Sequence, residues 1–484
     1  MQIAFDNSYA RLPERFFRAM EPRPVAAPRL IALNRPLAEA LGLDAEMLAG
    51  EEGIAALAGN RFPDGAAAIA SAYAGHQFGQ FVPQLGDGRA ILLGEVVGRD
   101  GKRYDIQLKG AGRTPFSRGG DGRAALGPVL REYLVSEAMA ALGVPTTRAL
   151  AALSTGEQVV RETFLPGAVL VRVASSHIRV GTFQYFAVRS DTDALRALAD
   201  HVVARHYPDA AQAENRYLAL LEAVVAAQAR LLPRWMLLGF IHGVMNTDNM
   251  SISGETIDYG PCAFMDAYDP GTVFSAIDQM GRYAFANQPS IAIWNLSRFA
   301  ETLIPLLAED SEKAVALAEQ ALAGFEPIFN ATILEGMRRK LGLFTEEEGD
   351  AALFTAFLRA LQASQGDFSL SFRALGEMLK GVPHPLAGHE AFDAWAVDWR
   401  ARLAREPEHA TARIEVMRQA NPLFIPRNHR IEEAIVAATE RDDFEQFHKL
   451  HEVLAQPFTE QPGRMEYANP PRPDERVLRT FCGT

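Results

Sequence analysis

The stretch LGDGRAILLGEVVGRDGKRYDIQLKG, residues 85–110, predicts two neighbouring strands of a sheet. Runs typical of strands cover residues 89–97 and 103–109, and a glycine turn at 98–101 joins them. In the second run Tyr104, Ile106 and Leu108 alternate with polar residues. Because side chains alternate between the two faces of a strand, we expect Lys109 on the face opposite these apolar residues.

Away from this stretch, the predicted elements change from strands to helices along the chain. Upstream, a strand-like run at 80–85 meets the run at 89–97 through a turn at Gly86-Asp87-Gly88, and a helical segment covers 36–48. Downstream, the pattern predicts a loop at 110–122, a helix at 127–142, strands near 149–153 and 169–173, and helical sequence at 192–239. A loop at 241–249, a hairpin at 250–257 and Asp258-Tyr259-Gly260 follow, and amphipathic helices cover 278–459.

The order of these parts favours an α+β, protein-kinase-like, two-lobed fold, with a small β-rich lobe and a larger helical lobe. We place an N-terminal extension that packs on the core at residues 1–71 and the β-rich lobe at 72–173. The helical lobe, with the catalytic and metal loops, covers 174–330, and a helical C-terminal region and tail covers 331–484.

Each part of this order has a chemical reason in a nucleotide site. Glycines at a turn let backbone N–H groups approach phosphate closely. Lys109 would neutralise phosphate, and Asn249 and Asp258 offer the oxygen ligands that Mg²⁺ prefers. Each residue alone also has an ordinary explanation, as part of a hairpin turn, a solvent-exposed strand or a loop. The joint order favours the nucleotide site, because several independent coincidences would otherwise have to occur together.

The loop HGVMNTDN, residues 242–249, departs from the kinase pattern. Protein kinases carry H-R-D-x-x-x-x-N here, whereas this chain has Val244 at the position of the catalytic Asp and a later carboxylate at Asp248. Either the chain is inactive as a kinase, or a carboxylate serves a transfer with a different geometry.

Arginines are concentrated around this framework. They are Arg89, Arg113, Arg118, Arg123, Arg172 and Arg179. Guanidinium groups bind phosphate oxygens in pairs, so the pattern indicates several phosphates to be held; surface ion pairing is the alternative. Arg172 and Arg179 stand where a kinase places its hinge, so phosphate recognition there would mean a reversed nucleotide.

Composition limits the classes of partner. With 484 residues, 48% of them hydrophobic and 22% charged, the chain is typical of a globular protein with two or three substructures. The 48 Lys and Arg residues against 60 Asp and Glu residues give a net charge of −12, which argues against general binding to nucleic acid or anionic lipid. No apolar stretch approaches the roughly 20 residues of a membrane helix, and the first residues lack the pattern of a signal peptide. We expect a cytoplasmic monomer.

Five segments together resemble the selenoprotein O family, which includes the bacterial YdiU-type proteins. They are YAGHQFG at 73–79, GDGR at 86–89, QLKGAGRTP at 107–115, HGVMNTDN at 242–249 and DYGPC at 258–262. The resemblance covers nearly the whole chain. It implies a pseudokinase-like protein adenylyltransferase that binds ATP in a flipped orientation, with Mg²⁺ or Mn²⁺. Such an enzyme moves AMP to Ser, Thr or Tyr hydroxyls of proteins and releases pyrophosphate.

The resemblance also implies roles for individual residues. Asp248 matches the proposed proton acceptor, and Asn249 and Asp258 match the metal ligands. The implied ATP contacts are Gly86, Gly88, Arg89, Lys109, Asp121, Gly122, Arg172, Arg179 and Asp258.

These implied roles agree with the residues that departed from the kinase pattern. With ATP reversed, the α-phosphate rather than the γ-phosphate faces the metal, and Arg172 and Arg179 hold phosphates. Glu132 is the expected ion-pair partner of Lys109, and Glu137 is the alternative. Positioning and charge neutralisation would supply most of the catalysis.

The chain contains two cysteines, Cys262 and Cys482, too few for a disulfide framework. Members of the family often pair a C-terminal selenocysteine or cysteine with a cysteine beyond the metal loop. Cys262 is the only possible intrachain partner of Cys482. We interpret Cys262 as a buried, unreactive thiol, which argues against redox control.

Two other functions stay open from the residues. A conventional protein or small-molecule kinase would transfer the γ-phosphate with Asp248 as the base. A non-catalytic nucleotide-binding scaffold would bind ATP without turnover. The intact Lys109, Asn249 and Asp258 argue against the scaffold, because a pure binder has little need of metal ligands.

Overall fold

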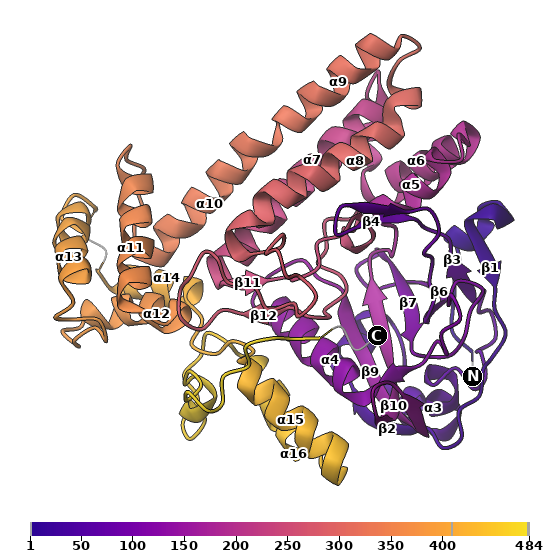
Figure 1. Cartoon of the computed structure of the whole chain (residues 1–484), viewed down its shortest axis with the longest axis horizontal. Helices are drawn as coiled ribbons and strands as arrows, with labels where there is room; N and C mark the ends of the chain where they lie inside the picture. Colours follow the sequence, from indigo (N-terminus) through magenta and orange to yellow (C-terminus); the bar gives the residue numbers. More distant parts are fainter. Residues whose placement is uncertain (1, 408–409, 482–484) are drawn as a thin grey trace.

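The computed structural model describes residues 2–407 and 410–481 of the chain. Within these residues, an antiparallel sheet in the N-terminal part is followed by a large helical region, so the architecture is mixed α+β (Figure 1). This confirms the predicted class and the predicted change from strands to helices.

Eight of the described strands form the main sheet, in the order β1-β3-β6-β7-β10-β9-β2 with β8 paired to β10. Its members are β1 (Phe17–Ala19), β2 (Arg29–Leu33), β3 (Ile69–Ser71), β6 (Ala90–Val97), β7 (Arg103–Lys109), β8 (Ala124–Ala125), β9 (Arg148–Val160) and β10 (Phe164–Ala174). Two small sheets pair β4 (Gly75–Gln77) with β5 (Gln80–Val82) and β11 (Phe240–Ile241) with β12 (Ala263–Phe264).

Helices account for most of the remaining described chain. The α-helices are α1 (Arg35–Ala40), α2 (Ala45–Ala49), α3 (Glu51–Leu57), α4 (Leu126–Ala141), α5 (Val180–Ala187), α6 (Thr192–His206), α7 (Arg216–Leu238), α8 (Gln288–Leu307), α9 (Ser311–Ala323), α10 (Phe325–Leu341), α11 (Asp350–Ser364), α12 (Phe368–Met378), α13 (Glu390–Leu403), α14 (Ala410–Ala420), α15 (Asn428–Arg441) and α16 (Glu445–Leu454). The short 3₁₀ helices are η1 (Tyr9–Arg11), η2 (Glu14–Phe16), η3 (Pro208–Gln212), η4 (Thr247–Asn249), η5 (Phe285–Asn287) and η6 (Met465–Tyr467).

The two faces of the sheet pack against different parts of the chain. Ile106 and Leu108 of β7 point into a core that they share with the N-terminal helices α1 to α3. Leu170 of β10 points to the other face, into the core that contains α4 and the large helices. Because side chains alternate along a strand, Lys109 and Arg172 also face α4. The predicted orientation of Lys109, opposite the apolar residues of its strand, is therefore confirmed.

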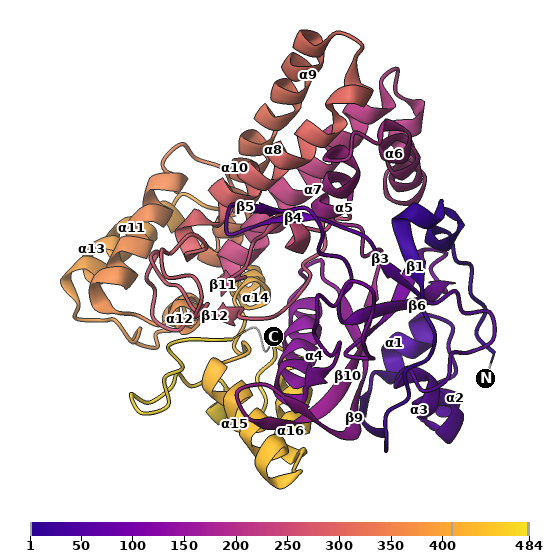
Figure 2. The same cartoon turned by 45° about the vertical axis from the view of Figure 1, so that its right-hand side comes forward.

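The helical region extends away from the sheet in two directions. Helices α7, α8, α9 and α10 form a long bundle, and α11 to α14 form a group at its far end (Figure 1). Helices α15 and α16 return to pack on α4 (Figures 1 and 2). The last described residues then cross back, where Thr480 pairs with Ser275 and its Oγ1 donates to the Pro261 carbonyl at 2.6 Å.

No described helix has both the length and the apolar character that crossing a membrane requires.

Three local predictions were wrong, each because a tertiary contact or a break replaced a local pairing. Residues 80–82 pair with β4 rather than with β6, since Phe78 and Gly79 both have positive φ and reverse the chain there. The expected hairpin at 250–257 does not form, because Ser251 pairs with Arg179 and Thr256 pairs with Thr146. The helical segment at 36–48 is divided into α1 and α2, with Asp44 capping the N-terminus of α2.

Candidate active site

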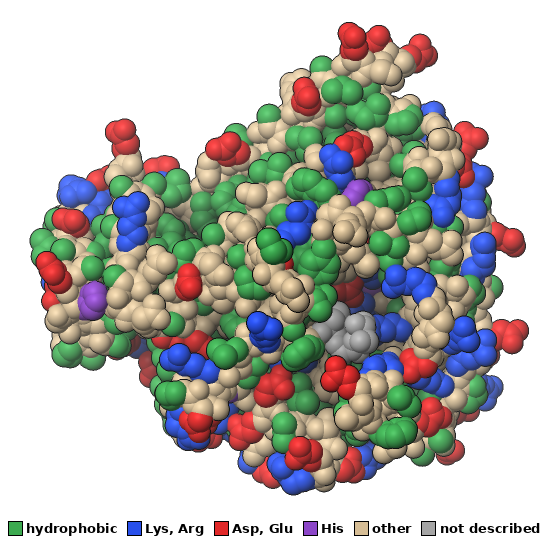
Figure 3. Space-filling view, in the orientation of Figure 1, with side chains coloured by type: hydrophobic (Ala, Val, Ile, Leu, Met, Phe, Trp, Pro, Cys, Tyr) green, Lys and Arg blue, Asp and Glu red, His purple; other side chains and the backbone are tan. Residues whose placement is uncertain are grey.

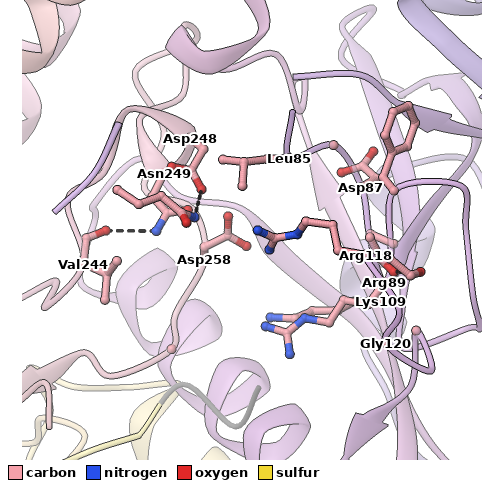
Figure 4. Close-up of a pocket in the computed structure, with 18 of the residues that line it drawn as sticks. Leu85, Asp87, Arg89, Lys109, Arg118, Gly120, Val244, Asp248, Asn249 and Asp258 are labelled. Carbon is pink, nitrogen blue, oxygen red and sulfur yellow. Dashed lines mark hydrogen bonds between the residues drawn. The ribbon is translucent and has the colours of Figure 1, made fainter. Parts of the chain in front are cut away.

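A cavity of about 640 Å³ lies between the sheet and the loops that follow α7. The residues that the sequence assigned to the site all line it: Gly86, Gly88, Arg89, Lys109, Asp121, Gly122, Arg172, Arg179, Asp248, Asn249 and Asp258. Asp248, Asn249 and Asp258 lie on one side of the cavity, and Arg89, Lys109 and Arg118 lie on the sheet side (Figure 4). On the outer surface, Lys and Arg side chains gather beside the hollow (Figure 3).

Part of the cavity lining is a network of ion pairs that connects the sheet with the loop carrying Asp258. Lys109 Nζ lies 2.5 Å from Glu132 Oε2, and Arg172 Nε lies 2.5 Å from the other oxygen of the same carboxylate. Arg172 Nη2 reaches Asp258 Oδ1 at 2.6 Å, and Arg179 pairs with Asp258 Oδ2. We call these five residues the paired wall. The expected partner of Lys109 is confirmed as Glu132.

The alternative partner, Glu137, lies one helical turn further along α4 and faces a different residue. Its carboxylate pairs with Arg148 at 2.7 Å and accepts the backbone N–H of Ala149 at 2.8 Å. Glu137 therefore supports the packing of α4 on β9 and does not line the cavity.

The paired wall shifts the pKa of each member in a direction that follows from burial and charge. Burial alone would raise the pKa of Asp258, but Arg179 and Arg172, and then Lys109, outweigh it and hold that pKa well below its usual range. Burial, with a smaller effect from Arg172, lowers the pKa of Lys109. Burial opposes the charged form of Arg179, but Asp258 outweighs it and raises the pKa of Arg179. The wall therefore favours the charged forms of Asp258 and Arg179, whereas burial disfavours the charged form of Lys109.

The backbone at Asp258 adopts a conformation that few non-glycine residues tolerate. Its φ is +64°, in the left-handed region, and its carbonyl accepts the N–H of Gly260 at 2.9 Å. Two arginines fix the side chain from opposite oxygens, so the surrounding contacts hold the residue in this conformation. Strain of this kind is concentrated at functional sites.

The loop at 242–249 is held by hydrogen bonds on every side. His242 Nε2 lies 2.8 Å from the Ile257 carbonyl, and Asn249 Nδ2 donates to the Val244 carbonyl at 3.0 Å. Asn246 Oδ1 accepts from the hydroxyl of Tyr283 at 2.6 Å. The bond from Asn249 Nδ2 to the Val244 carbonyl orients the amide and does not involve the side-chain oxygen of Asn249. Val244, at the position of the kinase catalytic Asp, takes part in this bond through its backbone carbonyl.

Asp248 lies at the end of this loop, in the short helix η4, and is buried. Gln77 Nε2 donates to its Oδ2 at 3.1 Å, while Arg179 donates to its backbone carbonyl at 2.6 Å. Burial raises the pKa of Asp248 to about 6, although the charge of Arg179 and the hydrogen bond from Gln77 oppose the shift.

The glycine turn at 86–88 is explained first by packing. Gly86 has φ +73°, and a Cβ there would lie 2.3 Å from the ring of Phe116. Thr114 Oγ1 donates to the Asp87 carbonyl at 2.6 Å, and Ser117 donates to the Gly88 carbonyl. Glycine is needed because the turn lies directly on the 114–117 segment, and this close packing forms the edge of the cavity.

Another part of the cavity lining carries two arginines that are not in the network of ion pairs. Arg89 and Arg118 make no side-chain ion pair or hydrogen bond with any residue that the structure describes. Arg118 has φ +49° in a loop rich in glycine, and its guanidinium points into the cavity (Figure 4). We call Arg89 and residues 117–122 the loop wall. Asp121, at its end, pairs with Arg161 at 2.8 Å.

Sequence reasoning gave no role to several residues that line the cavity. Gln77 and Tyr73 belong to the YAGHQFG segment, and the Arg179 guanidinium lies 4.8 Å from the centre of the Tyr73 ring. Val160 is the last residue of β9, and Arg161 follows it in the turn to β10. The quoted segment was the only sequence signal for Gln77 and Tyr73, and no local pattern points to Val160.

The cavity has the size and chemistry of a nucleotide site. Its volume falls in the usual range for small-molecule pockets. The Asn249 amide and the Asp258 carboxylate supply hard oxygen donors, and Mg²⁺ commonly uses one or two protein carboxylates together with phosphates and water. No group of three or more His, Cys, Asp or Glu side chains that could hold a metal exists among the described residues. The oxygens of Asn249 and Asp258 are of the kind that binds Mg²⁺ together with phosphate oxygens and water.

Cys262 is fully buried behind the cavity, as the sequence suggested. Cys482 lies outside the described residues.

Comparison with known proteins agrees with this chemistry. The family model described as "Protein adenylyltransferase SelO" matches residues 1–455. A protein of Rhodopseudomonas palustris (strain BisB5) named "Protein nucleotidyltransferase YdiU" is 65% identical over 490 residues, covering 100% of both chains. Proteins of the same name from Bradyrhizobium diazoefficiens and Methylorubrum extorquens are 64% and 63% identical, over 100% and 99% of both chains.

Proposed function

The chain belongs to the SelO family of protein adenylyltransferases, and from this premise we propose how its cavity moves AMP from ATP to a protein hydroxyl. The observation that carries the proposal is that Arg172 and Arg179 meet at Asp258, with Lys109 joined to them through Glu132. These residues line one cavity with Asp248 and Asn249, apart from Glu132 behind them.

We place the triphosphate at the paired wall, which we call the deep end of the cavity. The three guanidinium nitrogens of Arg172 each donate to a protein side chain, those of Glu132, Asp258 and Gln107. Arg172 therefore acts on phosphate chiefly through its charge. Arg179 donates from Nη1 to Asp258 and to the Asp248 carbonyl, and its Nη2 forms no hydrogen bond with a described residue. Arg179 Nη2 and Lys109 are therefore the direct phosphate ligands that we propose.

The nucleoside would then lie toward the other end, near Val160, Asp121 and Gly122. This end combines an apolar side chain with backbone and carboxylate hydrogen-bonding groups, whereas the deep end is cationic. In this flipped orientation the α-phosphate lies toward Asp248 and Asp258. The β- and γ-phosphates face Lys109 and Arg179, and Arg89 and Arg118 add positive charge to the cavity.

Asp248 is the residue that we propose accepts the proton of the incoming Ser, Thr or Tyr hydroxyl. The hydroxyl oxygen forms a bond to the α-phosphorus, the bond from the α-phosphorus to the bridging oxygen of the β-phosphate breaks, and pyrophosphate leaves with that electron pair. The carboxylate of Asp248 takes the proton. A positioned acid–base group of this kind contributes about 10²- to 10⁴-fold to a rate.

Asn249 and Asp258 would hold a divalent metal, Mg²⁺ or Mn²⁺. The metal would supply positive charge that neutralises the phosphates. Both oxygens of Asp258 accept from arginines, and each retains lone pairs for a further ligand.

A kinase-like arrangement of two lobes is also part of the proposal. The β-rich lobe at 72–173 would supply Lys109, and the helical lobe at 174–330 would supply the catalytic and metal loops, with residues 1–71 and 331–484 as added regions. The low number of cysteines supports action on cytoplasmic proteins.

Photoaffinity labelling tests the orientation of the nucleotide. An ATP analogue with an azide on the adenine ring is irradiated with the protein, with and without excess ATP, and the labelled peptides are identified. We expect ATP-protected label on residues 117–123 or 160–161. Protected label at 174–179, beside Arg172 and Arg179, would mean that the adenine lies where we place phosphates, and the flipped orientation would be wrong.

A further inference from the structure

A short segment outside the main sheet holds the loop that carries Asp248. After β3 the chain leaves the sheet, and β4 and β5 lie beside α5 and the large helices (Figure 2). We call residues 73–82 the strap. The Ala74 N–H donates to the Gly181 carbonyl at 2.9 Å, the His76 N–H donates to Thr247 Oγ1 at 2.7 Å, and the Phe78 N–H donates to Asn246 Oδ1 at 3.0 Å.

The strap leaves no space above one oxygen of Asp248. A Cβ on Gly75 would lie 2.7 Å from Asp248 Oδ1. This oxygen is buried and has no hydrogen-bond partner among the described residues. Because the Gly75 backbone covers it, an acceptor hydroxyl cannot approach Oδ1 from the cavity.

The other oxygen of Asp248 is held by Gln77, a side chain of the strap. Gln77 Nε2 donates to Asp248 Oδ2 at 3.1 Å, and Gln77 itself lines the cavity. A carboxylate oxygen can accept more than one hydrogen bond, so Oδ2 can accept from an incoming hydroxyl while it keeps the bond to Gln77.

We propose that Gln77 is a positioning residue for the transfer, which holds Asp248 so that Oδ2 faces the acceptor hydroxyl. The inference rests on the proposed role of Asp248 as proton acceptor. Through Gln77, the strap holds the Asp248 carboxylate in one rotamer. Without the Gln77 donor the carboxylate could rotate away from the acceptor hydroxyl. Precise orientation of reacting groups is worth orders of magnitude in rate.

A purely structural role for Gln77 does not account for its position. The backbone of the strap is already anchored at Ala74, His76 and Phe78, and the Gln77 side chain is only half-buried. Its cross-strand neighbour Gln80 is the same residue type in the same hairpin, but Gln80 is exposed and does not line the cavity. Gln80 is therefore the matched control.

The experiment measures steady-state AMP transfer to a protein acceptor and, separately, the Kd for ATP in the full-length chain. The variants are Gln77→Met, Gln77→Glu, Gln80→Met, Asp248→Asn and the double variant Gln77→Met/Asp248→Asn. Gln77→Met removes the donor with little change of shape. Gln77→Glu keeps the shape of glutamine but, when ionised, has no donor and repels Asp248.

We expect kcat to fall about 10- to 100-fold in both Gln77 variants, because a hydrogen bond to a charged group is lost. The Kd for ATP should stay within about twofold of that of the unmodified chain. Gln80→Met should behave like the unmodified chain. The double variant should be no slower than Asp248→Asn alone, because Gln77 acts through Asp248.

Three results would contradict the inference. Normal kcat in Gln77→Glu would show that the donor is not needed. Loss of ATP binding in parallel with activity would make Gln77 a nucleotide ligand instead. A further rate loss in the double variant would show that Gln77 acts independently of Asp248. Full activity of Asp248→Asn would instead refute the proposed role of Asp248, so failure of the inference and failure of the proposed function are distinguishable.

Discussion

Two parts of the cavity lining carry positive charge in different ways. In the paired wall, Arg172 and Arg179 are buried and Lys109 is partly buried, and each is held by Glu132 or Asp258. In the loop wall, Arg89 and Arg118 lie at the cavity without an ion pair to any described residue. Ion pairs fix the side-chain positions of the first set before a ligand binds, whereas the charges of the second set are available to bind phosphate.

This difference explains how one cavity can both orient a reaction and bind a highly charged substrate. Preorganised charges stabilise a transition state without having to move, which makes them effective in catalysis. Unpaired, more exposed arginines contribute through attraction that salt screens, so they serve binding more than chemistry. Substitutions in the two walls should therefore have different consequences for stability, kcat and KM.

The largest effect is expected from Asp258→Ala. It removes a metal ligand and leaves two buried guanidinium groups without their shared carboxylate. We expect AMP transfer to fall by more than about 10³-fold and the free energy of unfolding to fall by about 3 kcal/mol. Urea unfolding with parallel activity assays measures both. Asp121→Ala, which breaks a pair on the loop wall, should cost at most about 1 kcal/mol of stability; equal losses in the two variants would remove the distinction between the walls.

A smaller loss is expected from Glu132→Gln. The neutral side chain keeps its shape but no longer balances Lys109 and Arg172, so both cations should move relative to the phosphates. We expect kcat/KM to fall about 10²-fold, which corresponds to about 2.7 kcal/mol. The control is Glu137→Gln on the same helix, which should leave activity per folded molecule unchanged. A loss in Glu137→Gln equal to that in Glu132→Gln would contradict the account.

Lys340 provides a third case, a buried cation that forms no ion pair with a carboxylate of the described residues. Its Nζ lies 4.3 Å from the centre of the Phe372 ring, and burial lowers its pKa from 10.5 to about 7. The unfolded chain therefore binds more protons than the folded chain between these values, so stability should rise with pH above 7.

The Lys340→Met variant isolates this effect. It should be more stable than the unmodified chain at pH 6.5, and the difference should shrink by about 2 kcal/mol by pH 9. Urea unfolding at both pH values measures the difference. Lys313→Met, at an exposed position of α9, should show no such change. A difference for Lys340→Met that does not depend on pH would mean that Lys340 is not neutralised in the folded chain.

The smallest effect is expected from Arg118→Gln on the loop wall. We expect KM for ATP to rise about fivefold, equivalent to about 1 kcal/mol, and stability to change by less than about 0.5 kcal/mol. The increase should be smaller at high salt. Arg113→Gln, in the same loop but outside the cavity lining, is the control. A loss confined to kcat would place Arg118 with the chemistry and not with binding.

The sequence predicted the parts of the site that depend on local order. Alternation along β7 predicted Lys109 on the face opposite the apolar residues, and Glu132 was its expected partner, with Glu137 as the alternative. The structure selects Glu132 because Arg172, on the neighbouring strand, faces the same carboxylate. That choice depends on the register between β7 and β10, which a single sequence does not specify.

The contacts that the sequence could not predict join distant segments. The strap reaches the 242–249 loop across about 170 positions of sequence, with Gln77 and Asp248 separated by 171. The turn at 86–88 was read as a hairpin between adjacent strands, but its glycines accommodate Phe116 instead. In both cases the pairing is decided by tertiary packing, which local propensity does not encode.

The most direct test of the account uses ATP labelled separately at the α- and γ-phosphates, with a mixed protein substrate and a divalent metal. The unmodified chain and Asp248→Asn are compared, with ATP binding measured for both. The account predicts protein-bound label only from the α-phosphate, and its loss in Asp248→Asn while ATP still binds. Protein-bound label from the γ-phosphate would contradict the flipped orientation, and full α-label transfer by Asp248→Asn would contradict the assignment of this residue.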